Sequence, residues 1–214
     1  MKEEIRPEDS SRFRAYHLWM KAPNPMVTLI RTFDVTDLWR TAKRKNRKKN
    51  ALLVYCIAKA ASSVPEFYTL PENGKLYRYD RLAVSVIVRT NRENQADEIC
   101  FCDIPFSPDL DVFCADYDRL TAEAARTGRD LDCSEDCMVI GTSAITETEL
   151  DGAVNIYAGA YANPFLIWGK ARQAWFRTRL AISFQFHHTQ MDGAHAGRFL
   201  ETLQNEICRV SSVS

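Results

Sequence analysis

The sequence lacks the long apolar segment that a membrane-spanning helix requires. No apolar run approaches the roughly 20 residues needed to cross a bilayer. The first fourteen residues, MKEEIRPEDSSRFR, are charged where a secretory signal would be apolar. We therefore expect a cytoplasmic protein.

An excess of charge of either sign is also missing. The chain has 28 basic and 28 acidic residues and a formal net charge of zero at pH 7. A protein whose main partner is a nucleic acid or a membrane surface usually carries a strong basic excess. We expect neither of these partners, and a small molecule as substrate.

Sequence signatures of several other protein classes are absent. There is no Gly-rich loop of the kind that binds phosphates, no internal repeat and no low-complexity segment. No Ser or Cys lies in a recognisable nucleophile elbow, so a mechanism through an acyl-enzyme is disfavoured.

The seven cysteines do not form a convincing metal-binding pattern. An odd number in a chain that we expect to be intracellular favours reduced thiols. Cys100-x-Cys102 and Cys133-x-x-x-Cys137 could each be half of a zinc site, but neither is a Cys-x-x-Cys and a predicted helix separates them. We therefore expect no metal.

The size and apolar content of the chain fit one globular domain. With 214 residues, 46% of them hydrophobic, the chain buries enough surface to fold without disulfides or a metal. We expect residues 1–214 to form a single domain.

Hydrophobic periodicity predicts a mixture of strands and helices. Strands are expected at residues 26–35, 75–80, 82–90, 98–106, 137–146 and 179–186, and helices at 51–64, 109–126 and 194–207. A further helix should begin at Thr36, which is a suitable N-cap. The strands at 75–80 and 82–90 follow each other closely, and we expect them to pair as a hairpin.

The segment 184–195, FQFHHTQMDGAH, lies where the last predicted strand ends and the last predicted helix begins. Neighbouring side chains on an extended backbone point to opposite faces, so only one of His187 and His188 is expected to do chemistry. Gly193 allows a tight turn that keeps Asp192 near His188. The segment therefore predicts an imidazole base with a fixed neighbour.

The pattern His-His-x-x-x-Asp-Gly at such a junction, near the C-terminus of a chain of this length, resembles the chloramphenicol acetyltransferase family. The resemblance covers nearly the whole chain and includes the segment IPFSPDLD at 104–111 and the Ser-Ala step at 143–144. It implies the α/β fold of that family, an α+β two-layer sandwich in which a mixed β-sheet carries helices on one face.

The resemblance implies roles for two residues at the reaction centre. His188 would be the general base, and the hydroxyl of Ser143 would donate a hydrogen bond to the oxyanion of the tetrahedral intermediate. A general base contributes roughly 10²- to 10⁴-fold to the rate and one oxyanion donor roughly 10²- to 10³-fold.

Asp192 is implied to be structural. In the family the Asp of the His motif pairs with an Arg that precedes an aromatic residue by four positions, which here is Arg12 before Tyr16. The Trp that usually stands two residues before that Arg is Ser10 in this chain, and Arg14 is the alternative partner.

Further residues are implied for the two substrates. The family places lysines near the phosphates of coenzyme A, and the corresponding positions are Lys48 and Lys170. The family often has Thr where this chain has Ile167, at a position associated with a water that supports the oxyanion. The implied acceptor-binding residues are aromatic: Tyr16, Phe101, Tyr157 and Phe165.

The implied activity is transfer of an acetyl group from acetyl-CoA to a hydroxyl of a small acceptor, with chloramphenicol as the first candidate. Direct attack in a ternary complex, with His188 as general base, is simpler than an acyl-enzyme because no activated nucleophile is found. The resemblance also implies a homotrimer in which the imidazole of one subunit faces a pocket completed by its neighbour.

Two other hypotheses stay open. Two histidines and one carboxylate can coordinate iron or zinc, and the candidates would be His187, His188, Asp192 and His195. Against this, the first two should point apart, and His195 should lie a helical turn inside the following helix. The chain could also be a catalytically inactive small-molecule-binding protein of the same fold, or could use another alcohol or an amine as acceptor.

Overall fold

The computed structural model describes residues 1–90, 98–157, 159 and 161–212. The helices are α1 (Phe13–Trp19), α2 (Thr36–Arg44), α3 (Lys49–Ser62), α4 (Leu110–Thr127) and α5 (Gly193–Ser212), with short 3-10 helices η1 (Pro7–Asp9) and η2 (Pro65–Tyr68). The strands are β1 (Lys2–Ile5), β2 (Met26–Asp34), β3 (Thr69–Glu72), β4 (Lys75–Tyr79), β5 (Leu82–Arg89), β6 (Ile99–Pro105), β7 (Met138–Ala144), β8 (Phe165–Trp168), β9 (Arg172–Ala174) and β10 (Arg177–His187).

A large mixed sheet forms one layer of the molecule. Its strand order is β2-β10-β8-β7-β5-β6, and β9 pairs with the first residues of β10. The pairs β5–β7 and β7–β8 are parallel, and the other neighbours are antiparallel. A second, three-stranded sheet has the order β1-β4-β3.

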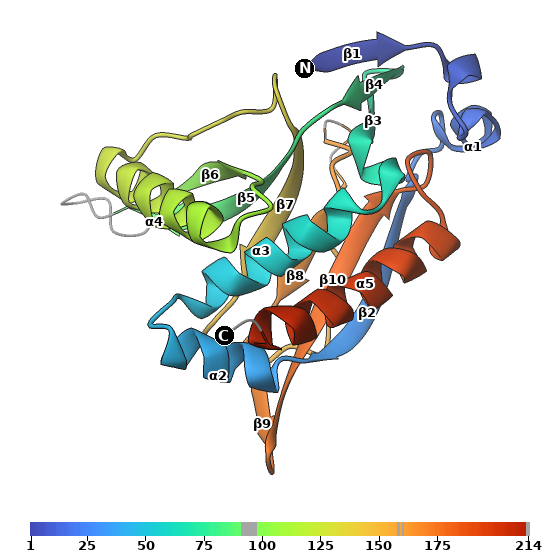
Figure 1. Ribbon diagram of the computed structural model, residues 1–214. Helices are drawn as coiled ribbons and strands as arrows, with labels where there is room; N and C mark the ends of the chain where they lie inside the picture. The colour runs from blue at the N-terminus through green and yellow to red at the C-terminus, as the bar shows by residue number, and fades with distance from the viewer. Residues whose placement is uncertain (91–97, 158, 160, 213–214) are drawn as a thin grey trace.

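The helices form the other layer. Figure 1 shows α2, α3 and α5 in front of β8, β10 and β2, and α4 in front of β5 and β6. Helix α3 packs against α2, α4 and α5, which explains why most of its residues are buried. The predicted two-layer α/β architecture is therefore confirmed. No helix in the described part of the chain is both long and apolar enough to span a membrane.

The alternation of residues in β10 produces this layering. Side chains on a strand alternate between the two faces of its sheet. Those that face the helices belong to the main hydrophobic core and are almost fully buried: Leu180, Ile182, Phe184 and Phe186. Ser183 and Gln185 point to the opposite face, which we call the outer face of the sheet.

The expected hairpin between residues 75–80 and 82–90 is wrong. β4 pairs with β1 and β3, whereas β5 pairs with β6 and β7 in the other sheet. The hairpin in this region joins β3 to β4 through Asn73 and Gly74, which have φ angles of 50° and 80°. Asn-Gly suits a two-residue hairpin turn because both residues tolerate positive φ. The turn chemistry, rather than the short separation of two strands, determines the pairing.

The N-cap of α2 also differs from the expectation. Thr36 is the first residue of the helix and makes no cap through its side chain. Val35 is the N-cap residue, and Asp34 before it satisfies the start of the helix, because its Oδ1 accepts hydrogen bonds from the backbone N–H and the hydroxyl of Thr36.

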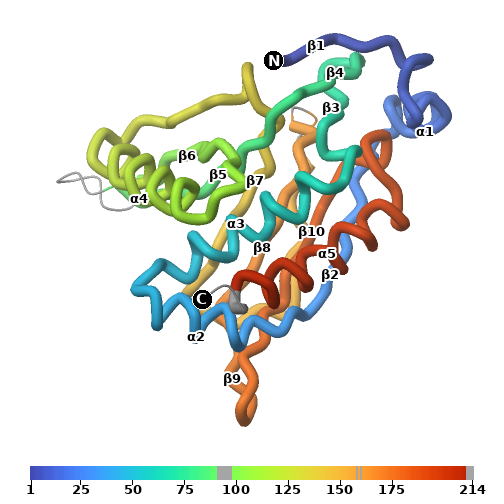
Figure 2. Tube along the Cα trace, viewed as in Figure 1, coloured from blue at the N-terminus to red at the C-terminus, as the bar shows by residue number. Residues whose placement is uncertain are grey.

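Segments that are distant in the sequence meet where β10 ends. β2 pairs with β10 over its whole length, from Asp34 opposite Arg179 to Met26 opposite His187. Helix α1, which precedes β2, therefore lies beside the junction of β10 and α5, as the blue and red parts of the tube show (Figure 2). The start of β3 reaches the same junction, where Gln190 Nε2 donates to Thr69 O at 2.7 Å.

Candidate active site

His188 lies in the turn 188–192 between β10 and α5, which we call the catalytic turn. Its backbone N–H donates to Pro25 O at 2.8 Å, which attaches the turn to the segment before β2. The N–H groups of Gln190 and Met191 both donate to His187 O, at 2.9 and 3.2 Å. Main-chain hydrogen bonds thus fix the direction in which His188 leaves the sheet.

Arg12 contacts the catalytic turn at three points. Its Nη1 lies 2.9 Å from Asp192 Oδ2, its Nη2 donates to His188 O at 3.0 Å, and its Nε donates to Thr189 O at 3.3 Å. The ion pair expected between Arg12 and Asp192 is therefore present, and Arg12 rather than Arg14 makes it. The Arg12 side chain is 14% exposed and that of Asp192 is 37% exposed, so only the arginine half of the pair is largely buried.

The other oxygen of Asp192 holds the start of α5. Oδ1 accepts from the N–H groups of Ala194 and His195, at 3.0 and 3.3 Å. Burial raises the pKa of the Asp192 carboxyl, but the N–H of His195 and the guanidinium of Arg12 lower it by more, so its pKa lies below the usual range. Because both oxygens are occupied by structural partners, the geometry suits a positional role better than a proton relay.

His195 is closer to the catalytic turn than the sequence indicated. Helix α5 begins at Gly193, so His195 lies in its first turn. The Nδ1 atom is 2.8 Å from Asp192 Oδ1, and the Nε2 atom is 3.0 Å from Oε1 of Glu66 in η2. The expectation that His195 lies a full helical turn inside the helix is therefore wrong.

The two adjacent histidines have different surroundings. His187 is 3% exposed, and its Nδ1 accepts the N–H of Thr189 at 3.1 Å. Burial, followed by the nearby His188, lowers the pKa of His187 to about 4, so its ring is neutral at pH 7. His188 is half-buried. Among the described residues, no group of three or more His, Cys, Asp or Glu side chains is arranged to hold a metal.

Trp19, to which no motif draws attention, covers one face of His188. The two rings are stacked, with centroids 4.7 Å apart and planes 4° from parallel. Arg12, Tyr16 and Trp19 are spaced i, i+4 and i+7, so they share one side of α1, and this spacing is the sequence signal for Trp19. Tyr16 instead donates its hydroxyl to Gly74 O at 2.7 Å. Stacking on Trp19 restricts the orientation of the imidazole.

Ser143 does not lie beside His188 within this chain. Ser143 pairs with Ile167, and Ile167 pairs with Ser183, so Ser143 is two strands away from β10. From position 183 to His188 the chain advances five residues. The separation is therefore about 10 Å across the sheet and roughly 17 Å along it. One chain cannot bring both side chains to the same substrate atom.

Ser143 belongs to a row of side chains that crosses the outer face of the sheet. Extending the printed pairing of β5 with β7 by two residues puts Ile87 opposite Ser143. We call this the outer row, and its members are Phe101, Ile87, Ser143, Ile167, Ser183 and Ile30. Three of its apolar side chains are strongly exposed: Phe101 (52%), Ile30 (51%) and Ile87 (37%). An exposed apolar row of this kind is typical of a surface that another molecule covers.

Phe165 and Tyr157 lie between the catalytic turn and the outer row. Phe165 pairs with Gln185, three positions before His188, and its ring covers Gly141, where any side chain would clash with it. Gln185 Nε2 donates to Asn155 O at 3.0 Å, which places Tyr157, two residues further along, near the same part of the outer face. Phe101 lies at the far end of the outer row.

The two candidate coenzyme A lysines lie away from His188. Helix α3 runs from Lys49 towards η2, so Lys48 is at the end of α3 that is remote from Glu66 and the catalytic turn. Its Nζ is 2.9 Å from Asp118 Oδ1 and 5.6 Å from the centre of the Tyr117 ring. Lys170 is exposed and lies three residues beyond Ile167, at the end of β8 that points away from His188.

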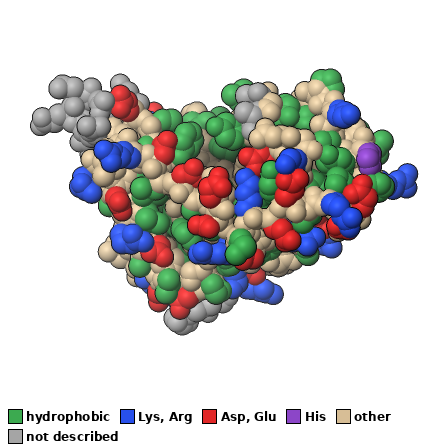
Figure 3. Space-filling view, turned by 90° about the horizontal axis from the view of Figure 1, so that it is seen from above, with side chains coloured by type: hydrophobic (Ala, Val, Ile, Leu, Met, Phe, Trp, Pro, Cys, Tyr) green, Lys and Arg blue, Asp and Glu red, His purple; other side chains and the backbone are tan. Residues whose placement is uncertain are grey.

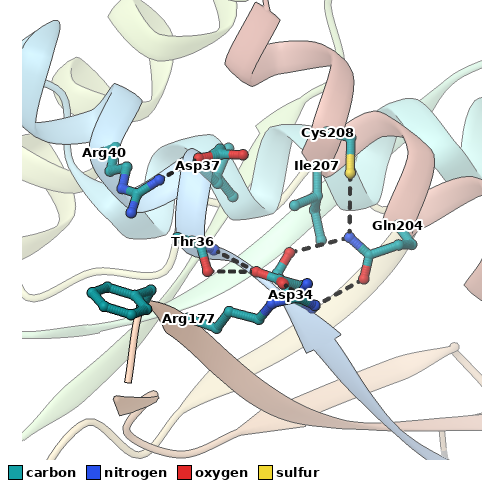
Figure 4. Close-up of a pocket in the computed structure, with 10 residues that line it drawn as sticks. Asp34, Thr36, Asp37, Arg40, Arg177, Gln204, Ile207 and Cys208 are labelled. Atoms are coloured by element: carbon teal, nitrogen blue, oxygen red, sulfur yellow. Dashed lines mark hydrogen bonds and ion pairs between the residues drawn. The ribbon is translucent and has the colours of Figure 1, made fainter. Parts of the chain in front are cut away.

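Two surface hollows lie elsewhere. One, of about 460 Å³, is lined by Asp34, Thr36, Arg177 and Gln204 among others, and Figure 4 shows these polar groups bonded to one another. Arg177 begins β10 and His187 ends it, roughly 33 Å away. The second, of about 470 Å³, lies between β6 and α4.

The face that carries β1 and α1, viewed from above, has acidic, basic and apolar side chains intermixed (Figure 3). Among the described residues, this face therefore has no large patch of a single charge sign that would attract a strongly charged ligand.

Comparison with known proteins identifies the family. The family model described as chloramphenicol acetyltransferase matches residues 8–204. Chloramphenicol acetyltransferase 2 of Escherichia coli is 29% identical over 197 residues, which cover 90% of this chain and 89% of that protein. A solved chloramphenicol acetyltransferase superposes with a TM-score of 0.82 at 20% identity, over 97% of this chain and all of the other. The cubic core of the pyruvate dehydrogenase multienzyme complex gives 0.67 at 19% identity, over 97% and 92%. Since the family model spans most of its length, the chain belongs to the chloramphenicol acetyltransferase family.

Proposed function

We propose that the protein transfers an acetyl group from acetyl-CoA to a hydroxyl of a small acceptor, with chloramphenicol as the first candidate. It would act as a single domain over residues 1–214, in the cytoplasm and without a metal. The observation that carries this proposal is the catalytic turn, in which a half-buried imidazole is held by Arg12 and Trp19. Membership of the family and the activity named for its curated relatives support the reaction type.

His188 would act as general base through Nε2. Its Nδ1 is buried and has no hydrogen-bond partner among the residues that the structure describes, so Nε2 is the nitrogen left for substrate. Nε2 takes the proton of the acceptor hydroxyl as the oxygen attacks the thioester carbonyl carbon. When the C–S bond breaks, the imidazolium returns this proton to the sulfur of coenzyme A. Such a base contributes roughly 10²- to 10⁴-fold to the rate.

Ser143 would donate its hydroxyl to the oxyanion of the tetrahedral intermediate, which is worth roughly 10²- to 10³-fold. Because Ser143 is far from His188 within one chain, we propose that the donor comes from a neighbouring subunit. A homotrimer with sites at its interfaces satisfies this requirement, and the exposed outer row supplies an apolar surface for the contact.

The remaining candidates divide between the two substrates. Lys48 and Lys170 would bind phosphates of coenzyme A, since both are exposed and correspond to lysine positions of the family. The acceptor would contact four aromatic side chains, Tyr16, Phe101, Tyr157 and Phe165. Trp19 joins this set because it stacks on the base. The hydroxyl of Tyr16 is already bonded to Gly74, so Tyr16 would contribute its ring.

The activity is tested by measuring free coenzyme A released from acetyl-CoA with and without added acceptors. The panel contains chloramphenicol, other primary and secondary alcohols, and amines. We expect release to depend on a hydroxyl acceptor and to be largest for chloramphenicol or a close analogue. If no acceptor stimulates release while ligands still bind, the protein is a binding module.

The shared site is tested by mixing two inactive variants, His188→Ala and Ser143→Ala, and allowing subunits to exchange. With random assembly, about one interface in four combines an intact His188 with an intact Ser143, so about a quarter of the wild-type rate should return. A site built from one chain would give no recovery. A monomer mass by light scattering, with activity retained, would also contradict the trimer.

A further inference from the structure

The catalytic turn is held from two sides. Arg12 and Trp19 hold it from α1, as described above. On the opposite side, Gln190 reaches Thr69 at the start of β3, and His195 reaches Glu66 in η2. The contacts on this second side have no role in the reaction proposed above.

His195 lies between two carboxylates. Its Nδ1 is 2.8 Å from Asp192 Oδ1 and its Nε2 is 3.0 Å from Glu66 Oε1, with side-chain exposures of only 17% for His195 and 13% for Glu66. Nε2 can donate to the Glu66 carboxylate, while Nδ1 accepts the backbone N–H of Asp192 at 3.2 Å, so both ring nitrogens have a partner. The backbone N–H of His195 also donates to Asp192 Oδ1 at 3.3 Å, so both the side chain and the main chain of His195 hold Asp192.

The largely buried carboxylate of Glu66 depends on His195 Nε2 as its close hydrogen-bond donor. Its Oε2 is buried and, within the described ranges, accepts no hydrogen bond, and the nearest cation is Arg198 Nη2 at 3.9 Å. A buried carboxylate that loses its one close donor is costly, because nothing replaces the lost hydration. The imidazole of His195 thus ties η2 to Asp192.

We propose that His195, held by Glu66, is a positioning residue for His188. Asp192 is then held by Arg12 at Oδ2 and by His195 at Oδ1 and at the backbone N–H, so the catalytic turn is fixed relative to α1 and to η2 together. Without His195 the turn loses its link to η2 and keeps only the Gln190–Thr69 hydrogen bond on that side, so the His188 ring loses its orientation towards the substrate. This inference rests on the proposed function, since the orientation matters for the rate only if His188 is the base.

The kinetic test replaces His195 by Gln in the intact oligomer. We expect kcat to fall roughly 10- to 100-fold, the cost of misplacing a catalytic group by about an ångström. The KM for acetyl-CoA should stay within about two-fold, because the turn does not bind the donor. Glu66→Gln keeps the imidazole but removes one carboxylate, and should give a smaller loss of the same kind. If His195→Gln does not fold, the kcat of Glu66→Gln tests the positioning role in its place.

The matched control is Glu201→Ala, on the same helix. Glu201 pairs with Arg31 at the surface, remote from the catalytic turn, so kcat should not change. A kcat of His195→Gln and Glu66→Gln within about two-fold of wild type, or a loss that falls on KM instead, would overturn the proposal.

A measurement that needs no activity separates this proposal from the proposed function. Long-range ¹H–¹⁵N spectra report the imidazole nitrogens of the four histidines. The His188 signals should shift in His195→Gln and Glu66→Gln and stay in place in Glu201→Ala. If the wild-type protein proves inactive with every acceptor, this shift alone decides: unchanged His188 signals overturn the positioning role, and shifted signals support it.

Discussion

The catalytic turn and the outer row differ in how complete they are within one chain. Around His188, the carbonyls of His188 and Thr189, the Asp192 carboxylate and one face of the imidazole find partners in the same chain. Around Ser143, the apolar neighbours Phe101 and Ile87 remain strongly exposed. Folding therefore positions the proposed base, whereas the surroundings of the proposed oxyanion donor would be completed only by assembly.

The difference follows from the chemistry of the two regions. A buried charge without a partner is costly, so Arg12 and the catalytic turn bind one another as the chain folds. Three buried polar atoms of the turn, His188 Nδ1, Thr189 Oγ1 and Gln190 Oε1, have no partner among the described residues. Apolar side chains on a sheet face can stay exposed until subunits associate, because their exposure costs free energy without preventing the fold. A site shared between subunits would thus combine a rigid half that folding forms with a half that only association covers.

The largest effect should come from removing the base. His188→Ala should lower kcat roughly 10²- to 10⁴-fold with little change in acetyl-CoA binding. Steady-state kinetics and calorimetric binding of the donor check both parts. His187→Ala is the matched control and should mainly reduce stability, since His187 is buried and bonded to the turn. A greater kinetic loss in His187→Ala would mean that the other imidazole is the base.

Removing the oxyanion donor comes next. Ser143→Ala should lower kcat roughly 10²- to 10³-fold, because one hydrogen bond to the developing charge is lost. The thermal midpoint and the oligomer mass should be unchanged, since the side chain is half-buried and small. If the variant keeps its full rate, the outer row holds no part of the reaction centre and the comparison between the two regions loses its chemical meaning.

Much of the fold could be predicted because its signals are local. The alternation in β10 and the acidic start of α4, where Asp109 accepts two backbone N–H bonds, are visible in the sequence. The pairing of β4 was predicted wrongly because strand partners depend on distant segments, here β1. The Asn73-Gly74 turn was the local signal that identifies β3 as its other neighbour.

The site was predictable only where a motif carries it. His188 and Asp192 follow from one short pattern, and Arg12 follows from resemblance. Trp19 and Glu66 were not found, because their contacts join residues far apart in sequence: Trp19 stacks on His188 from α1, and Glu66 reaches His195 from η2. The separation of Ser143 from His188 also required strand register, which no single sequence fixes.

The buried histidine makes the catalytic turn sensitive to acid. The pKa of His187 is lowered to about 4 in the folded protein from 6.5. Above pH 6.5 the ring is neutral in both states and costs nothing. As pH falls from 6.5 to about 4, only the unfolded chain gains the proton, so the protein loses about 3 kcal/mol of stability.

Denaturant unfolding at several pH values measures this loss. His187→Gln should abolish most of it between pH 6.5 and 4, because an amide does not titrate and can still accept the N–H of Thr189. Glu201→Ala serves as the control and should keep the wild-type slope. An unchanged slope in His187→Gln would assign the acid sensitivity to other groups.

The Arg12–Asp192 pair should have a smaller effect on stability. Asp192 is 37% exposed, so solvent screens the pair, and each single variant, Arg12→Met or Asp192→Leu, should cost about 1–2 kcal/mol. The double variant should lose less than the sum, because no charge is left without its partner. Its rate should stay low, since the carbonyls of His188 and Thr189 have lost their donors. Strictly additive losses would mean that the two side chains are not coupled in solution.

The smallest effects should come from the lysines, because they lie at the surface. Lys48 pairs with Asp118, but the two side chains are 59% and 50% exposed, and such a pair contributes little to stability. Lys48 is therefore able to leave Asp118 for a phosphate of coenzyme A. Lys48→Ala and Lys170→Ala should each raise the KM for acetyl-CoA about 3- to 10-fold without lowering kcat, and added salt should reduce the difference.

Asp118→Asn distinguishes this role from a merely structural one. The substitution removes the carboxylate that competes with a phosphate for Lys48, so the KM for acetyl-CoA should fall slightly at low salt. If the Lys48–Asp118 contact instead supports the fold, both Lys48→Ala and Asp118→Asn should raise KM and lower the thermal midpoint together. Opposite changes in KM for the two variants would place Lys48 in the coenzyme A site. Parallel changes would remove Lys48 from the coenzyme A site and leave Lys170 as its remaining candidate.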